Sequence, residues 1–288
     1  LAYRSVMTHP ESEWFDDALY KLAWTQYRLS NPKKAISSFL ALVDLGKNEK
    51  TGKALLENES LDYIAISFSE TDITGENGLK RAITFCKKLD DEIKGTQILH
   101  RLGDVYDKQG RYSIAIKTYK TLLKMYPDYK LNPHVEAGLI KSMSRTLSII
   151  ESSKLKIDYF KKYNRRSKWT LSQNDKKTIA SADSIAASQL YDASVAYHQV
   201  ALQKNTKSAY DKAVESYRLF IDFYKLLPEA NECHYNLAEV LFSMGDYFNA
   251  AQEYMTVSKK YPGSKYHEAA AWNAIVASQN LIKQEGEK

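Results

Sequence analysis

The sequence has 288 residues, of which 44% are hydrophobic and 26% are charged, a balance typical of a folded protein. Its 11 glycines and 6 prolines are too few for a β-rich fold with many tight turns, so long helices are expected. The net charge of +6 does not by itself indicate nucleic acid, and no apolar run of about 18 residues is present that could span a bilayer.

The first predicted element is the end of a helix around Tyr3, which Pro10 terminates. The segment ESEWFDDALYKLAW follows over residues 11–24, and the same order returns near the other end, where Tyr254–Pro262 precede GSKYHEAAAWNAIV. We therefore expect the sequence to start inside the second helix of a helical hairpin. The exposed side of that helix is then available for more protein N-terminal to Leu1 or for self-association.

Three helical hairpins are predicted from a recurring pair of small residues twelve positions apart, with an aromatic residue four positions after the second. These residues are Ala23, Ala35 and Phe39 in the first copy, Gly103, Ala115 and Tyr119 in the second, and Ala238, Ala250 and Tyr254 in the third. Small residues are needed where two antiparallel helices cross closely, because a larger side chain would force the helices apart. Pro127 and Pro262 end two of the copies.

Weaker copies of the hairpin are expected over 53–90, 133–163 and 176–228, each with apolar residues at helical spacing. The stretch 164–177 is polar and lacks helical periodicity. We therefore predict an N-terminal array over residues 1–163, a polar and basic insert or hinge over 164–176, and a C-terminal array over 177–288. A last helix over about 264–283 is expected to cap the array with a polar outer face.

The hairpin pattern resembles the tetratricopeptide repeat, which has a small residue on its first helix, Ala and an aromatic residue on its second, and a closing Pro over about 34 residues. This resemblance implies an all-α fold, a right-handed α-solenoid of about six such hairpins with a C-terminal capping helix. Residues 16–29 and 259–272 look most like a variant found in bacterial cell-envelope proteins, among them an outer-membrane-assembly lipoprotein and a coordinator of the Tol–Pal system. The resemblance implies an envelope or periplasmic location, with the cytoplasm as the alternative, and a place in a larger assembly.

The sequence contains no motif that carries chemistry. It has no phosphate-binding Gly-Lys-Ser loop, no nucleophile elbow and no paired-His zinc motif, and its six histidines are scattered. Cys86 and Cys233 fit neither a metal-ligand spacing nor a disulfide framework. We therefore expect no enzyme activity, no catalytic residues, no metal site and no cofactor.

Stacked hairpins of this kind place their first helices along the inner wall of a superhelix, so the resemblance implies a partner-binding groove there. The residues expected to face this groove combine aromatic or histidine rings with carboxylates. They are Asp17, Tyr20, Trp24, Tyr27, Arg28, Gln97, His100, Asp104, Asp107, Lys108, Tyr191, Val195, His198, Gln199, Glu232, Tyr235, Glu239 and Phe242. This character predicts a protein or peptide partner with apolar and basic side chains. The alternative is that several of the rings fill the seam between hairpins.

A basic run over residues 154–169 suggests a rival function, the binding of an anionic polymer or a cell-wall component. Its cationic residues are Lys154, Lys156, Lys161, Lys162, Arg165, Arg166 and Lys168. A solvated helix face followed by a polar linker explains the same run, since Ile157, Phe160 and Tyr163 have the helical spacing of core residues. Nucleic acid is not expected as a partner. A third possibility is an accessory module of a larger enzyme whose catalytic domain lies outside this sequence.

Overall fold

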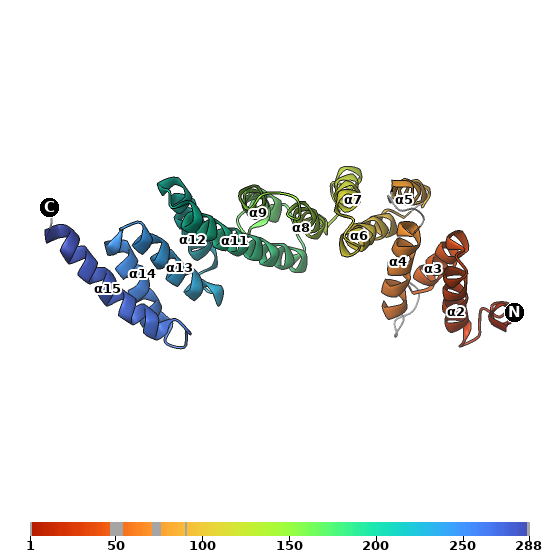
Figure 1. The fold of residues 1–288 in the computed structure, drawn as a ribbon. Coiled ribbons are helices and arrows are strands. Elements are labelled where there is room, and N and C mark those ends of the chain that lie inside the picture. The colour runs from red at the N-terminus through yellow and green to blue at the C-terminus, as the bar shows by residue number, and fades with distance from the viewer. Residues whose placement is uncertain (1, 47–53, 71–75, 90, 287–288) are drawn as a thin grey trace. The chain divides into compact units, whose positions relative to one another are not determined.

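The computed structural model describes residues 2–46, 54–70, 76–89 and 91–286. Within these ranges all regular structure is helical, which confirms the predicted all-α fold. The chain divides into two compact units, Leu1–Arg145 and Thr146–Lys288, which we call the N-terminal unit and the C-terminal unit and describe separately (Figure 1). None of the described helices has both the length and the apolarity needed to cross a membrane.

The N-terminal unit is a row of helices that pack largely in chain order. They are α1 (Ala2–Val6), α2 (Phe15–Arg28), α3 (Pro32–Gly46), α4 (Ala54–Ser69), α5 (Glu76–Lys88), α6 (Glu92–Lys108), α7 (Tyr112–Met125) and α8 (Asn132–Met143). Helices α2 and α3 form one hairpin and α6 and α7 another, while α3 against α4 and α7 against α8 join successive pairs. Helix α1 packs against α2, and self-association through α1 stays a prediction.

The C-terminal unit repeats this plan around one long helix. Its helices are α9 (Ile149–Tyr163), α10 (Lys168–Leu171), α11 (Lys176–Lys204), α12 (Lys207–Tyr224), α13 (Glu229–Ser243), α14 (Tyr247–Lys260) and α15 (His267–Gly286). Helix α11 packs against both α9 and α12, and α12, α13, α14 and α15 then follow one another in contact. Each helix therefore buries its apolar face against its neighbours in the row, as in a repeat array.

The turns between paired helices share one backbone arrangement. A residue with positive φ follows the first helix in four hairpins, and these residues are Ser30 (φ 54°), Gly110 (φ 72°), Asn205 (φ 47°) and Gly245 (φ 77°). In three of the turns the next N–H donates to the carbonyl five positions earlier, from Asn31 to Gln26, from Arg111 to Tyr106 and from Asp246 to Leu241. This bond closes the helix end as in a Schellman motif. Glycine adopts positive φ without steric cost, which explains the two glycines at matching places in the repeats.

The small residues predicted at the helix crossings are fully buried. Ala23, Ala35, Ala115, Ala238 and Ala250 all have 0% exposure. At Gly103 an added Cβ would lie 2.4 Å from Cε1 of Tyr119, so no side chain fits there without displacement. The aromatic residues that follow, Phe39, Tyr119 and Tyr254, are buried as well. These observations confirm that close helix crossings underlie the repeated pattern.

The boundary between the two units differs from the sequence prediction. The sequence placed it after residue 163 and paired 149–163 with the helix before it, whereas the units divide between Arg145 and Thr146. Helix α8 packs against α7, and α9 packs against α11. Phe160 shows the physical reason, because its buried ring lies 4.9 Å from the ring of Phe223 and 6.1 Å from that of Tyr224, both on α12.

The segment predicted as a polar insert, 164–176, is packed into the C-terminal unit. It contains α10, and Asn164 and Thr170 are buried. Asn164 Nδ2 donates to the carbonyl of Phe160 at 2.9 Å, and Thr170 Oγ1 donates to the carbonyl of Asn164 at 2.9 Å. Its polar composition indicated a linker, but these side chains satisfy backbone groups at helix ends rather than facing water.

The exposed side of the last helix, α15, is mixed rather than uniformly polar as the sequence predicted, because it carries Glu268, Gln279 and Lys283 together with large apolar residues. A stripe of alanines, Ala270, Ala274 and Ala277, is buried, and α15 packs against α14. Among the apolar residues of α15 outside this stripe, Trp272 is 67% exposed and Ile282 is 70% exposed. The alanine stripe was readable from the sequence, but the exposed apolar residues sit at positions that a capping helix normally fills with polar side chains.

Candidate functional site

The predicted groove residues fall into three classes of exposure. The exposed ones are Asp17, Arg28, Lys108 and Gln199; the half-buried ones are Tyr20, Trp24, Tyr27, Gln97, His100, Asp104, Tyr191, Val195, His198, Glu232, Tyr235, Glu239 and Phe242; the buried one is Asp107. Half-buried rings and carboxylates are suited to contact a partner, because they are positioned by packing on one side and open on the other.

Three of the half-buried groove residues form one cluster with a fourth ring in the N-terminal unit, which we call the aromatic surface. It consists of Tyr20, Trp24 and Tyr27 on α2 and Tyr63 on α4, and Tyr63 was not identified from the sequence. The Trp24 ring lies 6.4 Å from Tyr20, 5.8 Å from Tyr27 and 4.3 Å from Tyr63, all edge-on. Phe39 of α3 lies fully buried beneath and stacks on Tyr63 at 5.3 Å. Packing therefore holds each ring in one orientation before any partner arrives.

Two carboxylates border the aromatic surface and are held by its tyrosines. Tyr20 Oη donates to Glu59 Oε1 at 2.6 Å, and Tyr27 Oη donates to Glu70 Oε1. Burial and the neighbouring Glu59 raise the pKa of Tyr20 to about 12, and burial with Glu70 raises the pKa of Tyr27. Both phenols therefore stay protonated as donors. Each carboxylate can accept further hydrogen bonds, so the rim is oriented to receive a cationic or N–H group.

The predicted groove residues of α6 are partly used within the protein. Tyr119 Oη donates to Asp104 Oδ1 at 2.6 Å, and the His100 ring lies 6.4 Å from the rings of Tyr119 and Tyr129. Burial lowers the pKa of His100, although Asp104 opposes this effect, so the imidazole is mainly neutral at pH 7. These contacts within the unit agree with the alternative considered from the sequence, that such rings fill the seam between hairpins, and their role in a groove stays a prediction.

Asp107 is a correction to the predicted groove, because its carboxylate is buried between α6 and α8. Lys141 Nζ donates to Asp107 Oδ2 at 2.7 Å and Ser142 Oγ donates to Oδ1 at 2.7 Å. The residue is only 8% exposed. Its role is therefore to tie α8 to α6 rather than to contact a partner.

Replacing Asp107 by alanine is expected to lower the free energy of unfolding of the N-terminal unit by about 2 kcal/mol, because Ser142 loses its buried acceptor. Burial by itself would raise the pKa of Asp107, but the hydrogen bonds from Lys141 and Ser142 hold it below its ordinary value. The carboxylate thus contributes stability above its ordinary pKa, and this is lost as the pH falls through the lowered folded-state pKa. Melts of both proteins from neutral to strongly acid pH should converge; a difference that stays constant would contradict the assignment.

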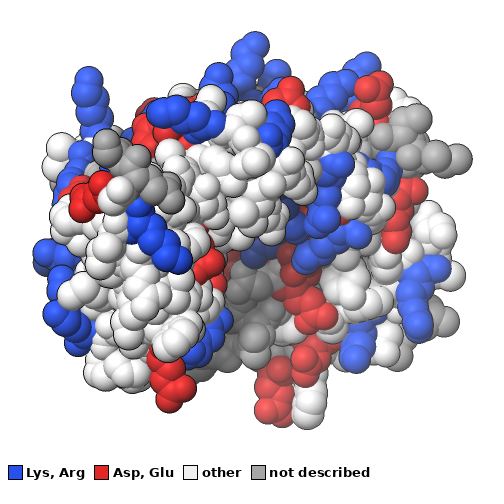
Figure 2. Space-filling view, turned by 60° about the vertical axis from the view of Figure 1, so that its left-hand side comes forward, with Lys and Arg blue, Asp and Glu red and all other residues white. Residues whose placement is uncertain are grey.

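Three of the seven cations in the basic run predicted as a patch are paired with carboxylates of other helices. Lys156 pairs with Asp192 at 3.2 Å, Arg165 pairs with Asp183 at 3.0 Å and Arg166 pairs with Asp222 at 3.1 Å. The other cations of the run, Lys154, Lys161, Lys162 and Lys168, are exposed. Two of the apolar residues between them, Phe160 and Tyr163, are buried as predicted. On the face drawn in Figure 2, lysine and arginine side chains are scattered among carboxylates and uncharged residues.

In the C-terminal unit, two of the predicted groove residues of α13, Tyr235 and Glu239, are joined through Asn273 of α15. Tyr254 Oη donates to Glu239, and Asn273 Nδ2 donates to Glu239 Oε1 at 3.2 Å and to Tyr235 Oη at 3.3 Å. The Tyr235 ring stacks on Tyr266 at 4.4 Å. Glu239 is therefore already surrounded by donors, while Tyr235 stays half-buried beside it.

Three other predicted groove residues of this unit are spread over different contacts. His198 Nδ1 lies 3.3 Å from Tyr217 Oη, and burial lowers the pKa of His198. Phe242 packs edge-on against Tyr247 at 5.1 Å, and Tyr191 does the same against Phe220 at 5.9 Å. These three side chains therefore contact different partner rings, and their role in a groove stays a prediction.

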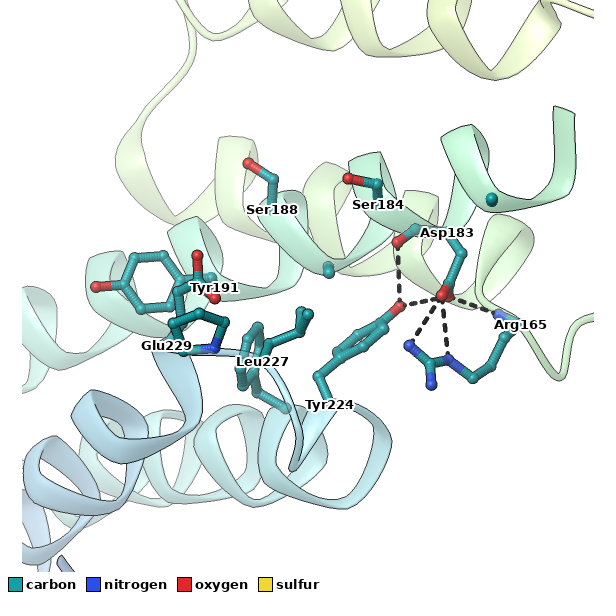
Figure 3. Close-up of a pocket in the computed structure, with 12 residues that line it drawn as sticks. Arg165, Asp183, Ser184, Ser188, Tyr191, Tyr224, Leu227 and Glu229 are labelled. Carbon is teal, nitrogen blue, oxygen red and sulfur yellow. Dashed lines mark hydrogen bonds and ion pairs between the residues drawn. The ribbon is translucent and has the colours of Figure 1, made fainter. Parts of the chain in front are cut away.

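A cavity of about 450 Å³ beside Tyr191 includes residues that the sequence did not identify (Figure 3). Small residues of α11 line one side, aromatic rings of α12 and the turn before α13 line the other. The lining residues are Arg165, Ala180, Asp183, Ser184, Ala187, Ser188, Tyr191, Phe220, Tyr224, Leu227, Pro228 and Glu229. The sequence missed most of them because the repeat template placed groove residues in the 176–228 copy only from Tyr191 onward. The recurrence of Ala and Ser at helical spacing was the available signal.

Among the described residues, metal-ligating groups do not cluster and neither thiol is activated. No group of three or more His, Cys, Asp or Glu within them could hold a metal ion. Both cysteines are buried and free, and burial raises the pKa of the Cys86 thiol to about 12 and also raises that of Cys233. These thiols are therefore poor nucleophiles at neutral pH.

Family models described as tetratricopeptide repeat match residues 17–45 and 96–129 of the N-terminal unit and residues 232–264 of the C-terminal unit. A comparison with curated proteins gives no match. A solved structure described as "Computational Design of Self-Assembling Cyclic Protein Homooligomers" is 11% identical over 99% of this chain and 93% of its own, with a TM-score of 0.17. Tetratricopeptide repeats, which generally mediate protein–protein interactions and are typically non-catalytic, are therefore present in both units of this chain.

Proposed function

We propose that this protein is a non-catalytic scaffold that binds a partner protein or peptide along the first helices of its hairpins. The observation that carries the proposal is the aromatic surface of the N-terminal unit with its two tyrosine-held carboxylates. Fixed aromatic rings supply contact area at low entropic cost, and tryptophan and tyrosine dominate interface hot spots.

The chemistry of this surface favours one kind of partner. Trp24 and its neighbouring tyrosines are open on one side, and Glu59, Glu70 and the exposed Asp17 supply negative charge around them. A side chain with an apolar stem and a cationic head satisfies both features, since ring faces attract cations and carboxylates pair with them. The expected ligand is therefore a peptide segment in which Lys or Arg stands beside aromatic or aliphatic residues.

We also propose that the scaffold works within a bacterial envelope assembly. The support for this step is the resemblance of residues 16–29 and 259–272 to envelope variants of the repeat. Fractionation of cells that produce the native protein should place it with periplasmic or membrane fractions. Recovery in the cytosolic fraction alone would reject this part of the proposal and leave the binding surface untouched.

Peptide selection tests the binding proposal directly. A random peptide library displayed on phage and selected on the full chain should be enriched in Lys or Arg beside apolar residues. For an enriched peptide, Trp24→Ala should weaken binding by about thirtyfold, as expected for a hot-spot residue. Trp14→Ala is the matched control, because Trp14 is 62% exposed in the same unit and lies outside the aromatic surface.

A second variant tests the binding surface even if Trp24→Ala fails to fold. Replacing Glu59 and Glu70 together by glutamine keeps the size of both side chains and removes two charges. The affinity of the basic peptide should fall by about tenfold while the melting temperature stays close to that of the wild type. Enrichment of acidic peptides, or equal binding by the Trp14 and Trp24 variants, would contradict the assignment.

A further inference from the structure

We propose that a cleft in the C-terminal unit binds an acidic peptide segment that carries an aliphatic residue beside its carboxylates. The cleft has a volume of about 540 Å³, and we call it the cationic cleft. Four of its lining residues are cationic: Arg165 and Arg166 from the segment before α10, Lys225 at the end of α12 and Lys260 at the end of α14. This site is separate from the aromatic surface and has the opposite charge preference.

The one carboxylate that lines the cationic cleft is weakly held. Asp222 Oδ2 pairs with Arg166 Nη1 at 3.1 Å, and the side chains are 64% and 58% exposed. An exposed pair of this kind adds little stability, so a carboxylate of a ligand can share or replace Asp222. The guanidinium has five N–H donors, and the bond to Asp222 uses one of them. His234, which also lines the cleft, is paired with Glu253 at 2.6 Å.

Both arginines are oriented by aromatic rings. The guanidinium of Arg166 lies 4.3 Å from the ring centre of Phe223, and that of Arg165 lies 4.8 Å from the ring centre of Tyr224. Asp183 fixes Arg165 further by accepting from its backbone N at 2.9 Å and its Nε at 3.1 Å, and it also accepts from Tyr224 Oη at 2.9 Å (Figure 3). Planar donors held in this way lose little freedom when they bind a carboxylate.

The apolar part of the cationic cleft decides between classes of ligand. Leu226 is 90% exposed at the turn after α12, and Leu227 lines the cleft next to it. A peptide can supply an aliphatic side chain to cover these leucines, whereas a sulfated or phosphorylated polymer cannot. Stacked nucleic-acid bases would need open ring faces, but arginines cover Phe223 and Tyr224. The observations therefore favour an acidic peptide over an anionic polymer.

The basic run offers a charge-matched control for testing the cationic cleft. The probe is a short labelled peptide of alternating glutamate and leucine, and its binding to the full chain is measured by fluorescence anisotropy. Lys225→Ala with Lys260→Ala should weaken binding by about tenfold or more, because two charge-assisted contacts are removed. Lys154→Ala with Lys161→Ala removes the same charge from exposed positions of α9 outside the cleft and should leave binding within about twofold.

A gain of affinity provides a test that misfolding cannot imitate. Asp222→Asn removes the competing carboxylate and should tighten binding of the glutamate–leucine peptide by about threefold or more. A peptide with glutamine in place of glutamate should bind at least about tenfold more weakly than the acidic one. Trp24→Ala should not affect either peptide, so failure of this proposal is distinguishable from failure of the proposed function.

Three results would overturn the proposal. Equal loss in the two lysine pairs would mean that the basic run attracts the peptide diffusely. Tighter binding of a heparin fragment than of the acidic peptide, with a steep dependence on salt, would assign the cleft to anionic polymers. Equal binding of the glutamate and glutamine peptides would show that the cationic side chains recognise no carboxylate.

Discussion

Substitution of Gly103 by alanine is expected to lower the free energy of unfolding of the N-terminal unit by about 3 kcal/mol, at the upper end of typical overpacking costs. The added Cβ would lie 2.4 Å from Cε1 and 2.7 Å from Cδ1 of Tyr119, closer than carbon atoms approach in folded proteins. In an unobstructed helix the same substitution would stabilise by roughly 1 kcal/mol. The sign of the measured change therefore separates the steric effect from helix propensity.

The Tyr119 ring has little room to move away from the new methyl group. It is 1% exposed, its hydroxyl is bound to Asp104, and Gly138 on α8 lies on another side of it, where an added Cβ would be 3.0 Å from Cζ. The ring of α7 thus occupies the space left by glycines on α6 and α8. Moving the Tyr119 ring away from residue 103 would disturb its contacts with Asp104 and Gly138. The added methyl group therefore has to be accommodated by separating α6 from α7.

The loss of stability is measured by chemical denaturation, with hydrogen exchange of α6, α7 and α8 as the local probe. A local probe is needed because the two units need not unfold together. Gly263→Ala is the control, because a Cβ there meets no atom within 4 Å, and it should change stability by no more than about 0.5 kcal/mol. Combining Gly103→Ala with Tyr119→Leu should cost less than the sum of the two single changes. An unchanged or raised stability of Gly103→Ala would remove steric exclusion as the reason for this glycine.

The sequence predicted the hairpins well because the determinant is local. A small residue at each crossing and an aromatic residue four positions later both lie within one hairpin, and Ala115 and Tyr119 are buried as that pattern requires. Turn residues follow the same logic, since positive φ favours glycine at Gly110 and Gly245. Ser30 has the same backbone conformation without glycine, which a search for glycine at turns could not find.

The candidate site was less predictable, because position on a helix does not tell which groups already have partners. The repeat template identified Trp24 and Asp107 as groove residues on equal terms. The structure leaves the Trp24 ring half-buried at the aromatic surface, whereas Asp107 is enclosed by Lys141 and Ser142 of α8, two residues that no local pattern links to it. The cationic cleft was also beyond reach, since Arg166, Lys225 and Lys260 come from three segments brought together by folding.

The boundary between the units was missed for the same reason. Nothing in the local pattern of residues 149–163 tells on which side that helix packs. Polarity then placed the break at 164–176, where Asn164 and Thr170 instead bond to nearby carbonyls and are buried. Aromatic residues of α9 and α12, far apart in the sequence, decide the packing of α9.

Replacing Phe160 by alanine tests that boundary and is expected to destabilise the C-terminal unit by about 4 kcal/mol, the usual cost of removing a buried aromatic side chain. Phe160 is 2% exposed and its ring contacts Phe223 and Tyr224 of α12. Hydrogen exchange should accelerate in α9, α11 and α12. The helices of the N-terminal unit, α8 included, should keep the wild-type protection from hydrogen exchange, because α9 belongs to the other compact unit.

Phe248→Ala is the matched control, since Phe248 lies in the same unit on α14 but is 56% exposed, and it should change stability by no more than about 0.5 kcal/mol. If Phe160→Ala instead increased exchange in α7 and α8, the helix 149–163 would belong to the array before it, as its place in the sequence suggested. The pattern of accelerated hydrogen exchange therefore shows which core contains the Phe160 ring. A cavity destabilises the cooperative unit around it more than distant, independent helices.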